Sequence, residues 1–298
     1  MKHFGAVFKD IRESRNIKLK DLAGSEKEIS IAQLSKFENG KSDITLQKLY
    51  PLLEQLGITL QEFEYAANGY KLNRLHTLFD KISKLYNENN QRGLERLLEI
   101  EKGKVCDGGG IRKEINALII KGALKEIDRD VVFTDGEKAF LLDYLNSIEE
   151  WGYYELRLYN ITMGILDLST IEDLTSDIVK RASVYRGVGL NEELVKTIVL
   201  NTVMATVSKK DFKKAIYFKN ILSDLMKDET DIFTRALLSF VTGEMEFYQG
   251  EEKSGKVKMQ NAIKIFEMVE SNNLVDSYAI HYKRITGEKY EFSNMKKN

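Results

Sequence analysis

The chain has 298 residues, of which 43% are hydrophobic and 31% charged, a balance typical of a soluble, helix-rich globular protein with room for two domains. Its net charge of -1 excludes a global basic field that would attract nucleic acid, and its single cysteine, Cys106, excludes an intramolecular disulfide framework. No apolar run is long enough to span a membrane and Met1-Lys2-His3 does not begin a signal peptide, so we expect a cytoplasmic protein.

The first 48 residues carry a local excess of Lys and Arg over Asp and Glu. Here Phe4, Val7, Phe8 and Ile11 follow the i, i+3, i+4, i+7 spacing that predicts a helix over residues 4–15 with one buried face. A short helix is predicted over 19–23, followed by a turn at 24–28.

A third helix is predicted between Ser30 and Asn39, because Ser30 and Gln33 fit a capping box and Gly40 suits a helix end in the left-handed conformation. Its apolar side carries Ile31, Leu34 and Phe37, together with Glu38. The opposite side is short and polar, as a helix that reads bases in the major groove must be. An ordinary surface helix with a polar face is the alternative.

A fourth helix is predicted from Thr45, with a stripe of leucines that ends at Leu56. Pro51 lies inside it and should remove the bond to the Gln47 carbonyl, so we expect a kink or a split. Either the fold tolerates the kink, or the kink orients the dimer or the linker. A fifth helix carries Phe63 and completes a domain over residues 1–66.

Residues 67–298 are predicted to form a second, entirely helical domain, because no alternating strand pattern persists there. Residues 103–110 are expected to form a loop. No strand precedes this loop and no Lys-Ser/Thr follows its last glycine, so it is not a phosphate-binding loop. The expected helices are those around 72–86 and 94–98, one that ends at Trp151, and those at 153–168, 170–185, 191–207, 211–226, 232–248 and 256–270.

These helices are predicted to pair. Ala215-Ile216 and Ala262-Ile263 occupy similar early positions in their helices, at a spacing longer than the ~34 residues of a regular tetratricopeptide repeat. We therefore expect an all-α protein in which the first domain is followed by a right-handed α-solenoid of degenerate tetratricopeptide-like helix pairs, whose concave surface suits an extended peptide.

The first domain resembles the Xre family of lambda-repressor-like helix-turn-helix domains. The matching residues are Leu22-Ala23, Gln33–Glu38, Asn39-Gly40-Lys41-Ser42 and Leu56-Gly57-Ile58. The resemblance implies an ion pair between Arg12 and Glu38, and a carboxylate on the buried side of a helix needs such a partner.

A second set of residues extends the resemblance beyond the first domain: Trp151-Gly152-Tyr153-Tyr154-Glu155-Leu156 with Asn160, and Gly243, Tyr248-Gln249-Gly250, Gly255, Ala262-Ile263, Phe266 and His281-Tyr282. With these residues, the whole chain resembles the Rgg/GadR/MutR family of transcriptional regulators. The resemblance implies a homodimer that binds double-stranded promoter DNA and, in many members, a short secreted peptide pheromone used in quorum sensing.

The candidate DNA contacts lie on or beside the third helix. We expect Gln33 and Lys36 to contact base edges and Ala32 to contact a thymine methyl, with support from Ser35 and Asn39. If the Gln33 side chain instead completes the capping box with Ser30, it is not available to contact a base. The expected phosphate contacts are Lys18, Lys20, Lys41 and Ser42, although solvated surface lysines would look the same.

The candidate peptide contacts are polar residues on otherwise apolar helices. These are Asn160, Arg157, Asn201, Tyr217 and Asn220. An asparagine amide donates and accepts at once, which suits a peptide backbone. A hydrogen bond between helices is the alternative for Asn201, and an ion pair with a glutamate is the alternative for Arg157.

The sequence offers no reactive constellation, so we expect neither an enzyme nor a cofactor. His3, His76 and His281 are scattered without the spacing of metal ligands, and Cys106 has no paired histidine. A protein-interaction adapter that uses the helical repeats and has no specific DNA operator is the alternative function.

Overall fold

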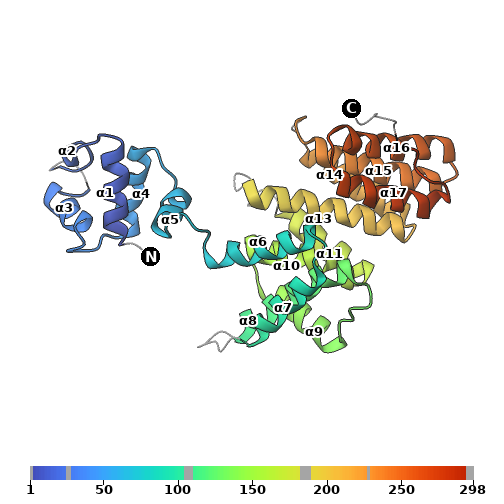
Figure 1. Cartoon of the computed structure of the whole chain (residues 1–298), viewed down its shortest axis with the longest axis horizontal. Coiled ribbons are helices and arrows are strands. Elements are labelled where there is room, and N and C mark those ends of the chain that lie inside the picture. Colours follow the sequence, from blue (N-terminus) through green and yellow to red (C-terminus); the bar gives the residue numbers. More distant parts are fainter. Residues whose placement is uncertain (1–2, 25–27, 104–109, 182–188, 227–228, 293–298) are drawn as a thin grey trace. The chain divides into compact units, whose positions relative to one another are not determined.

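The computed structural model describes residues 3–24, 28–103, 110–181, 189–226 and 229–292 (Figure 1). All regular elements in these ranges are helices, as predicted. Parts of the predicted turn at 24–28, of the predicted loop at 103–110 with Cys106, and of the predicted helix at 170–185 lie outside the described residues. None of the described helices combines the length and apolarity needed to cross a bilayer.

The chain divides into two compact units, Met1–Asn90 and Gln91–Asn298. The first unit contains α1 (Phe4–Ser14), α2 (Leu19–Leu22), α3 (Ile31–Glu38), α4 (Leu46–Leu56), α5 (Leu60–Ala67) and α6 (Arg74–Asn87). In it, α1 packs against α3 and α5, α2 packs against α3, and α4 packs against α5. The predicted domain border after residue 66 falls one residue before the end of α5 and stays a prediction.

The core of the first unit is built from most of the apolar side chains that the sequence predicts, but Phe4 and Ile31, which were expected on buried faces, are 44% exposed. Phe8, Leu34 and Leu53 are fully buried in one cluster, which joins α1, α3 and α4. Each helix contributes side chains three or four positions apart, so burial of this single face holds the short helices together.

Pro51 lies inside α4, which runs without a break from Leu46 to Leu56. Of the expected kink or split at Pro51, the split is therefore wrong. A proline in a helix removes one hydrogen bond, here to the Gln47 carbonyl. Leu49 and Leu53, on either side of the proline, are both buried, and this burial keeps the two halves in register.

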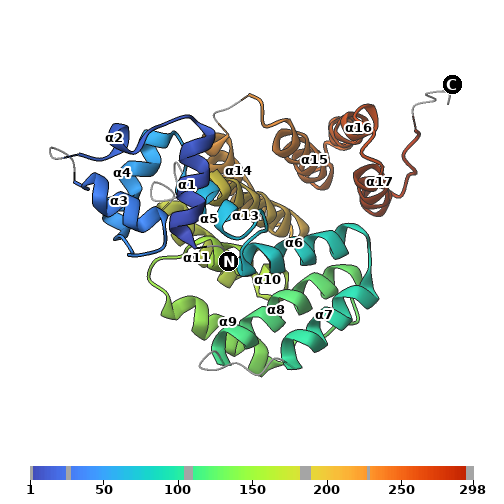
Figure 2. The same ribbon diagram turned by 60° about the vertical axis from the view of Figure 1, so that its left-hand side comes forward.

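The second unit is a succession of packed helices. They are α7 (Gln91–Gly103), α8 (Gly110–Ile127), α9 (Asp135–Ser147), α10 (Tyr153–Thr162), a 3₁₀ turn (Met163–Ile165), α11 (Leu168–Lys180), α13 (Gly189–Ser208), α14 (Phe212–Leu225), α15 (Ile232–Tyr248), α16 (Glu252–Met268) and α17 (Asn272–Thr286). The long helix α13 is central, because it packs against α10, α11, α14 and α15. Figures 1 and 2 both show α15, α16 and α17 side by side, and their contacts follow that order.

Several predictions for this unit need correction. The helix predicted to end at Trp151 is α9, which ends at Ser147. Helices α8 and α17 are absent from the predicted set. The single helix predicted over 153–168 ends at Thr162 and continues only as a 3₁₀ turn. Asp167 then caps a new helix, because its side chain accepts from the Thr170 backbone N–H at 2.9 Å.

The predicted helix pairing is present in the second half of this unit, where α13 packs on α14 and α15 on α16. Ala215 and Ala262 are both fully buried, as expected of small residues at helix contacts. Backbones also approach closely at Gly243 of α15 and Gly255 of α16, where a Cβ on either residue would lie within 2.6 Å of the other's carbonyl oxygen. Only glycine permits this packing of backbone on backbone.

Candidate functional site

Helix α3 begins and ends as its sequence predicts. The Ser30 hydroxyl accepts from the Gln33 backbone N–H at 3.2 Å, which satisfies one of the free donors of the first turn. At the other end Gly40 has a φ of +68°, and its N–H donates to the Phe37 carbonyl. The apolar side is anchored by Leu34 and Phe37, which are buried.

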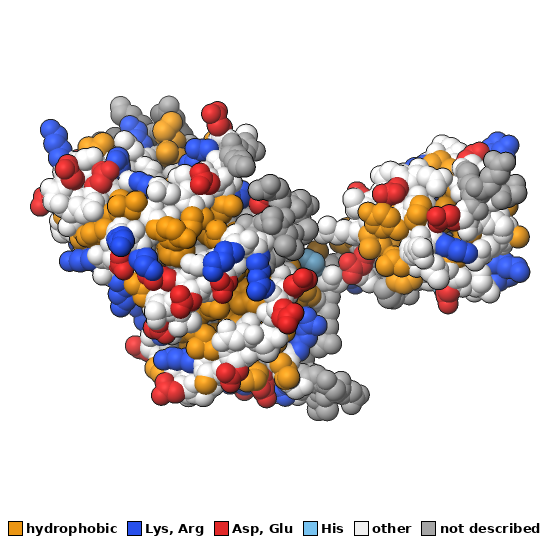
Figure 3. Space-filling model, turned by 180° about the vertical axis from the view of Figure 1, so that it is seen from behind, with side chains coloured by type: hydrophobic (Ala, Val, Ile, Leu, Met, Phe, Trp, Pro, Cys, Tyr) orange, Lys and Arg blue, Asp and Glu red, His pale blue; other side chains and the backbone are white. Residues whose placement is uncertain are grey.

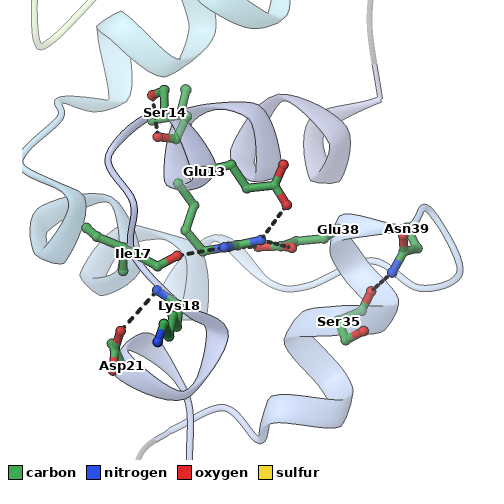
Figure 4. Close-up of polar contacts among 10 residues, drawn as sticks. Glu13, Ser14, Ile17, Lys18, Asp21, Ser35, Glu38 and Asn39 are labelled. Atoms are coloured by element: carbon green, nitrogen blue, oxygen red, sulfur yellow. Dashed lines mark hydrogen bonds and ion pairs between the residues drawn. The ribbon is translucent and has the colours of Figure 1, made fainter.

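A buried ion pair fixes α3 to α1 (Figure 4). Arg12 Nε donates to Glu38 Oε1 at 2.6 Å, and Arg12 Nη2 donates to Glu38 Oε2 at 2.8 Å, so the pair is bidentate. Arg12 Nη1 also donates to the Ile17 carbonyl at 2.6 Å. The hydrogen bond to Glu38 raises the pKa of Arg12. The pair that the Xre resemblance implied is thus present, and it ties α1, α3 and the segment before α2 together.

Gly5 allows α1 and α3 to approach closely. A Cβ on Gly5 would lie 1.8 Å from the Phe37 carbonyl oxygen and 3.2 Å from the Glu38 Cα. The absence of a side chain at Gly5 therefore sets the distance at which the Arg12–Glu38 pair forms.

The outer side of α3 carries the predicted base contacts. Ala32, Lys36 and Asn39 are exposed, while Gln33 and Ser35 are half-buried. The predicted phosphate contacts Lys18, Lys20 and Lys41 are exposed, and Ser42 is half-buried. Asn39 Nδ2 donates to the Ser35 carbonyl at 2.8 Å, so the Asn39 amide caps the last turn of α3.

The Gln33 side chain does not complete a capping box in α3. Its Oε1 instead accepts from Lys48 Nζ, in the first turn of α4, at 3.3 Å. Lys48 is not among the predicted contacts. Its one signal in the sequence is its position three residues after Thr45, at the start of the helix that follows α3.

The structure divides the predicted peptide contacts between two places. Asn201 Nδ2 of α13 donates to Asn160 Oδ1 of α10 at 3.0 Å, which is the bond between helices expected as the alternative for Asn201. Arg157 lies one turn before Asn160, and burial lowers its pKa. Tyr217 and Asn220 are exposed on α14, where Lys214 Nζ bonds Glu172 of α11 at 2.8 Å.

Two features of the second unit bear on ligand binding. Figure 3 shows hydrophobic side chains gathered on one face of this unit, with charged side chains around them. A small pocket of about 130 Å³ is lined by Leu145, Asn146, Ile148, Trp151, Leu174, Asp177, Ile178 and Arg181. It includes none of the predicted peptide contacts and is smaller than the ~300–1,000 Å³ of ordinary ligand pockets. Within the described ranges, no cluster of three His, Cys, Asp or Glu side chains is arranged to hold a metal ion.

Comparison with known families gives two matches. A model described as a helix-turn-helix domain matches residues 5–70. A model described as HTH-type transcriptional regulator Rgg, C-terminal domain, matches residues 107–280, which is more than half of the chain.

Solved structures align along nearly the full length. The SHP pheromone receptor Rgg2 of Streptococcus dysgalactiae has 28% sequence identity and a TM-score of 0.80, over 94% of this chain and 99% of its own. A putative transcriptional regulator from Listeria monocytogenes EGD-e has 18% identity and a TM-score of 0.79, over 96% of this chain and 98% of its own. The PrgX/cCF10 complex has 15% identity and a TM-score of 0.70, over 98% of this chain and 95% of the matched chain. At 18% and 15% identity, the last two matches show a shared fold.

Proposed function

From the premise that this chain belongs to the family of HTH-type transcriptional regulators Rgg, we propose that it binds promoter DNA as a homodimer and that a short signalling peptide controls it. The relative Rgg2 is a pheromone receptor, which supports the peptide part of the proposal. We propose a cytoplasmic location as well, since the proposed ligand is promoter DNA.

The proposal of DNA binding rests on the two different sides of α3, one buried and one exposed. Its apolar side and Glu38 are fixed to α1, while the exposed Ala32 and Lys36 are free of neighbouring bulk. A rigid helix with a short polar outer side can lie in the major groove. The exposed Lys18, Lys20 and Lys41 can meet the phosphates on either side of it.

A selection from random duplex DNA, followed by footprinting of the full chain at moderate salt, tests this part. We expect two half-sites about one helical turn apart, as for other helix-turn-helix dimers. Lys36→Ala should relax the preference at one base position, whereas Lys41→Ala should lower affinity for all sequences and reduce the salt slope by about 1. Lys81→Ala, on the exposed side of α6, is the control and should change neither. Without an enriched site, the protein would act as an interaction adapter.

The peptide part rests on the polar residues of α10 and α13. Asn160 and Asn201 form one bond with each other and are half-buried, so their remaining amide groups can meet a peptide backbone. Arg157, on the same face of α10 as Asn160, can meet a peptide carboxylate. We propose Tyr217 and Asn220 of α14 as contacts farther along the peptide.

Mass spectrometry of peptides retained from spent culture medium tests this part. We expect a short peptide on the wild-type protein and on Lys81→Ala, and a loss of retention in Asn201→Ala and Arg157→Ala. Equal retention by all four proteins would assign the peptide to another surface. The peptide should also change affinity for the selected DNA, because only a ligand that prefers one of two states shifts their equilibrium.

A further inference from the structure

Gln33 and Lys48 join the outer side of α3 to the first turn of α4. Lys48 Nζ donates to Gln33 Oε1 at 3.3 Å, and both residues are half-buried. Among the described residues, each of these two side chains has the other as its only polar partner. Gln33 follows the exposed Ala32 and lies three residues before the exposed Lys36 on α3, so Gln33 and the Lys48 ammonium bonded to it border the surface proposed to face the bases.

The chemistry of the two groups fixes their orientation. An ammonium has three N–H donors and no acceptor, so the oxygen of the Gln33 amide must face Lys48. Both N–H groups of the Gln33 amide then point away from Lys48, and two N–H groups of the ammonium are left over. The corner between α3 and α4 therefore presents donors from two adjacent side chains.

We propose that Gln33 and Lys48 together read one guanine in the major groove, with the Gln33 amide N–H donating to N7 and the Lys48 ammonium to O6. Guanine shows two adjacent acceptors on this edge, N7 and O6, whereas adenine shows the N7 acceptor and the N6 donor. This inference rests on the proposed DNA-binding function and names a specificity-determining residue, Lys48, on a helix that follows the recognition helix.

The same geometry disfavours adenine. A glutamine that reads adenine alone accepts from N6 with its oxygen while it donates to N7. Here one lone pair of the Gln33 oxygen already accepts from Lys48, so the adenine amino group would have to share that oxygen and would lie against the Lys48 ammonium, whose N–H meant for O6 would then have no acceptor. Two donors that face each other in a partly desolvated groove are repulsive, and such unpaired groups give large discrimination.

Selection from random duplex DNA with five forms of the full chain tests the proposal. Gln33→Ala identifies the base position that Gln33 contacts, because preference is lost there alone. At that position the wild type should select guanine, and Lys48→Met should accept guanine and adenine almost equally, a loss of about tenfold in discrimination. Lys48→Arg keeps the donors and should restore guanine, and Lys81→Met should match the wild type. Circular dichroism confirms that each variant is folded.

A base analogue separates the two contacts. Replacing the selected guanine by 7-deazaguanine removes N7 and should weaken the wild type about tenfold, while Gln33→Ala should be indifferent to the replacement. If Lys48→Met lowers affinity for every sequence and leaves the base preference unchanged, Lys48 is a phosphate contact and the proposal is wrong. Adenine at the Gln33 position of the wild type overturns it equally. If wild type and Lys81→Met enrich no site at all, the proposed DNA-binding function itself has failed.

Discussion

Substituting Gly5 by alanine should destabilise the first unit, although alanine is the better helix former. In an open helical position, Gly→Ala stabilises by about 1 kcal/mol. In α1 the new Cβ would lie 1.8 Å from the Phe37 carbonyl oxygen, where ordinary contact begins at 3.4 Å. Helix α3 must therefore move outward by roughly 1.5 Å or α1 must shift along it, and overpacking of this kind costs about 1–3 kcal/mol.

The cost does not end with the steric clash. The Arg12–Glu38 bonds are 2.6 and 2.8 Å long, so a displacement of this size takes them beyond hydrogen-bonding distance. A buried pair pulled apart leaves both charges poorly compensated, a cost of about 3–5 kcal/mol if neither regains water. We expect a net destabilisation of at least about 2 kcal/mol, confined to α1, α2 and α3.

Native-state hydrogen exchange on the full chain measures this effect locally, because a chain of two units need not unfold in one step. Peptides from α1 and α3 should lose protection in Gly5→Ala, while peptides from α15 and α16 should not change. Gly136→Ala is the matched control. Gly136 is also helical, but its Cβ would meet only the Thr134 hydroxyl at 3.9 Å, so it should not destabilise α9. Unchanged or increased protection of α1 in Gly5→Ala would refute the close-approach argument.

Three further predictions follow from single contacts. Arg12→Met should lower the free energy of unfolding of the first unit by about 3–5 kcal/mol, since Glu38 stays buried without a partner. Arg12→Lys should recover only part of this loss, because lysine cannot form the bidentate pair. Urea unfolding followed by hydrogen exchange in α3 measures both effects. Gly243→Ala should lower the calorimetric melting temperature of the second unit by the equivalent of about 1–3 kcal/mol, because its Cβ would lie 2.6 Å from the Gly255 carbonyl oxygen, and an unchanged melting temperature would contradict this. Burial raises the pKa of Tyr144 from 10.0 to about 12, and the neighbouring Glu155 adds to the shift. The neutral tyrosine therefore stabilises the folded state fully below pH 10, and this stabilisation is lost as the pH rises to about 12. The difference in tyrosinate absorbance between wild type and Tyr144→Phe, followed with pH, measures this titration.

The helix-turn-helix unit could be predicted from the sequence because its signals are local. The cap at Ser30, the end at Gly40 and the apolar spacing of α1 each lie within a few residues of the feature they determine. The partner of Gln33 could not be predicted, because Lys48 is fifteen residues away and meets Gln33 only through the tertiary packing of the first unit. The sequence shows which side chains need hydrogen-bond partners, but which residues become those partners depends on how the helices pack.

The second unit shows where periodicity stops being informative. Helix α8 carries Leu118, Ile119 and Ile120 in succession, and all three are buried, so no polar face marks it as a helix. Helix α17 is missed for the opposite reason, since Val275 and Tyr282 are its only buried residues and more than half of its side chains are polar. The expected helix over 153–168 was too long because apolar character alone does not show a break, whereas Asp167 as a cap does.

Polar residues on α13 illustrate why a polar side chain in an apolar helix does not by itself indicate a ligand. The Thr202 hydroxyl lies 2.8 Å from that of Thr175, which lies 2.9 Å from the Tyr159 hydroxyl, so this buried group of α10, α11 and α13 satisfies itself. Asn201 is the residue before Thr202, and its described side-chain bond is the single one to Asn160. An amide has two N–H groups and a carbonyl with two lone pairs, so most of its capacity remains for a partner. A candidate peptide contact thus differs from a core threonine in the number of its hydrogen-bonding groups that are not used within the fold. This number is known only once the packing of α10, α11 and α13 is known.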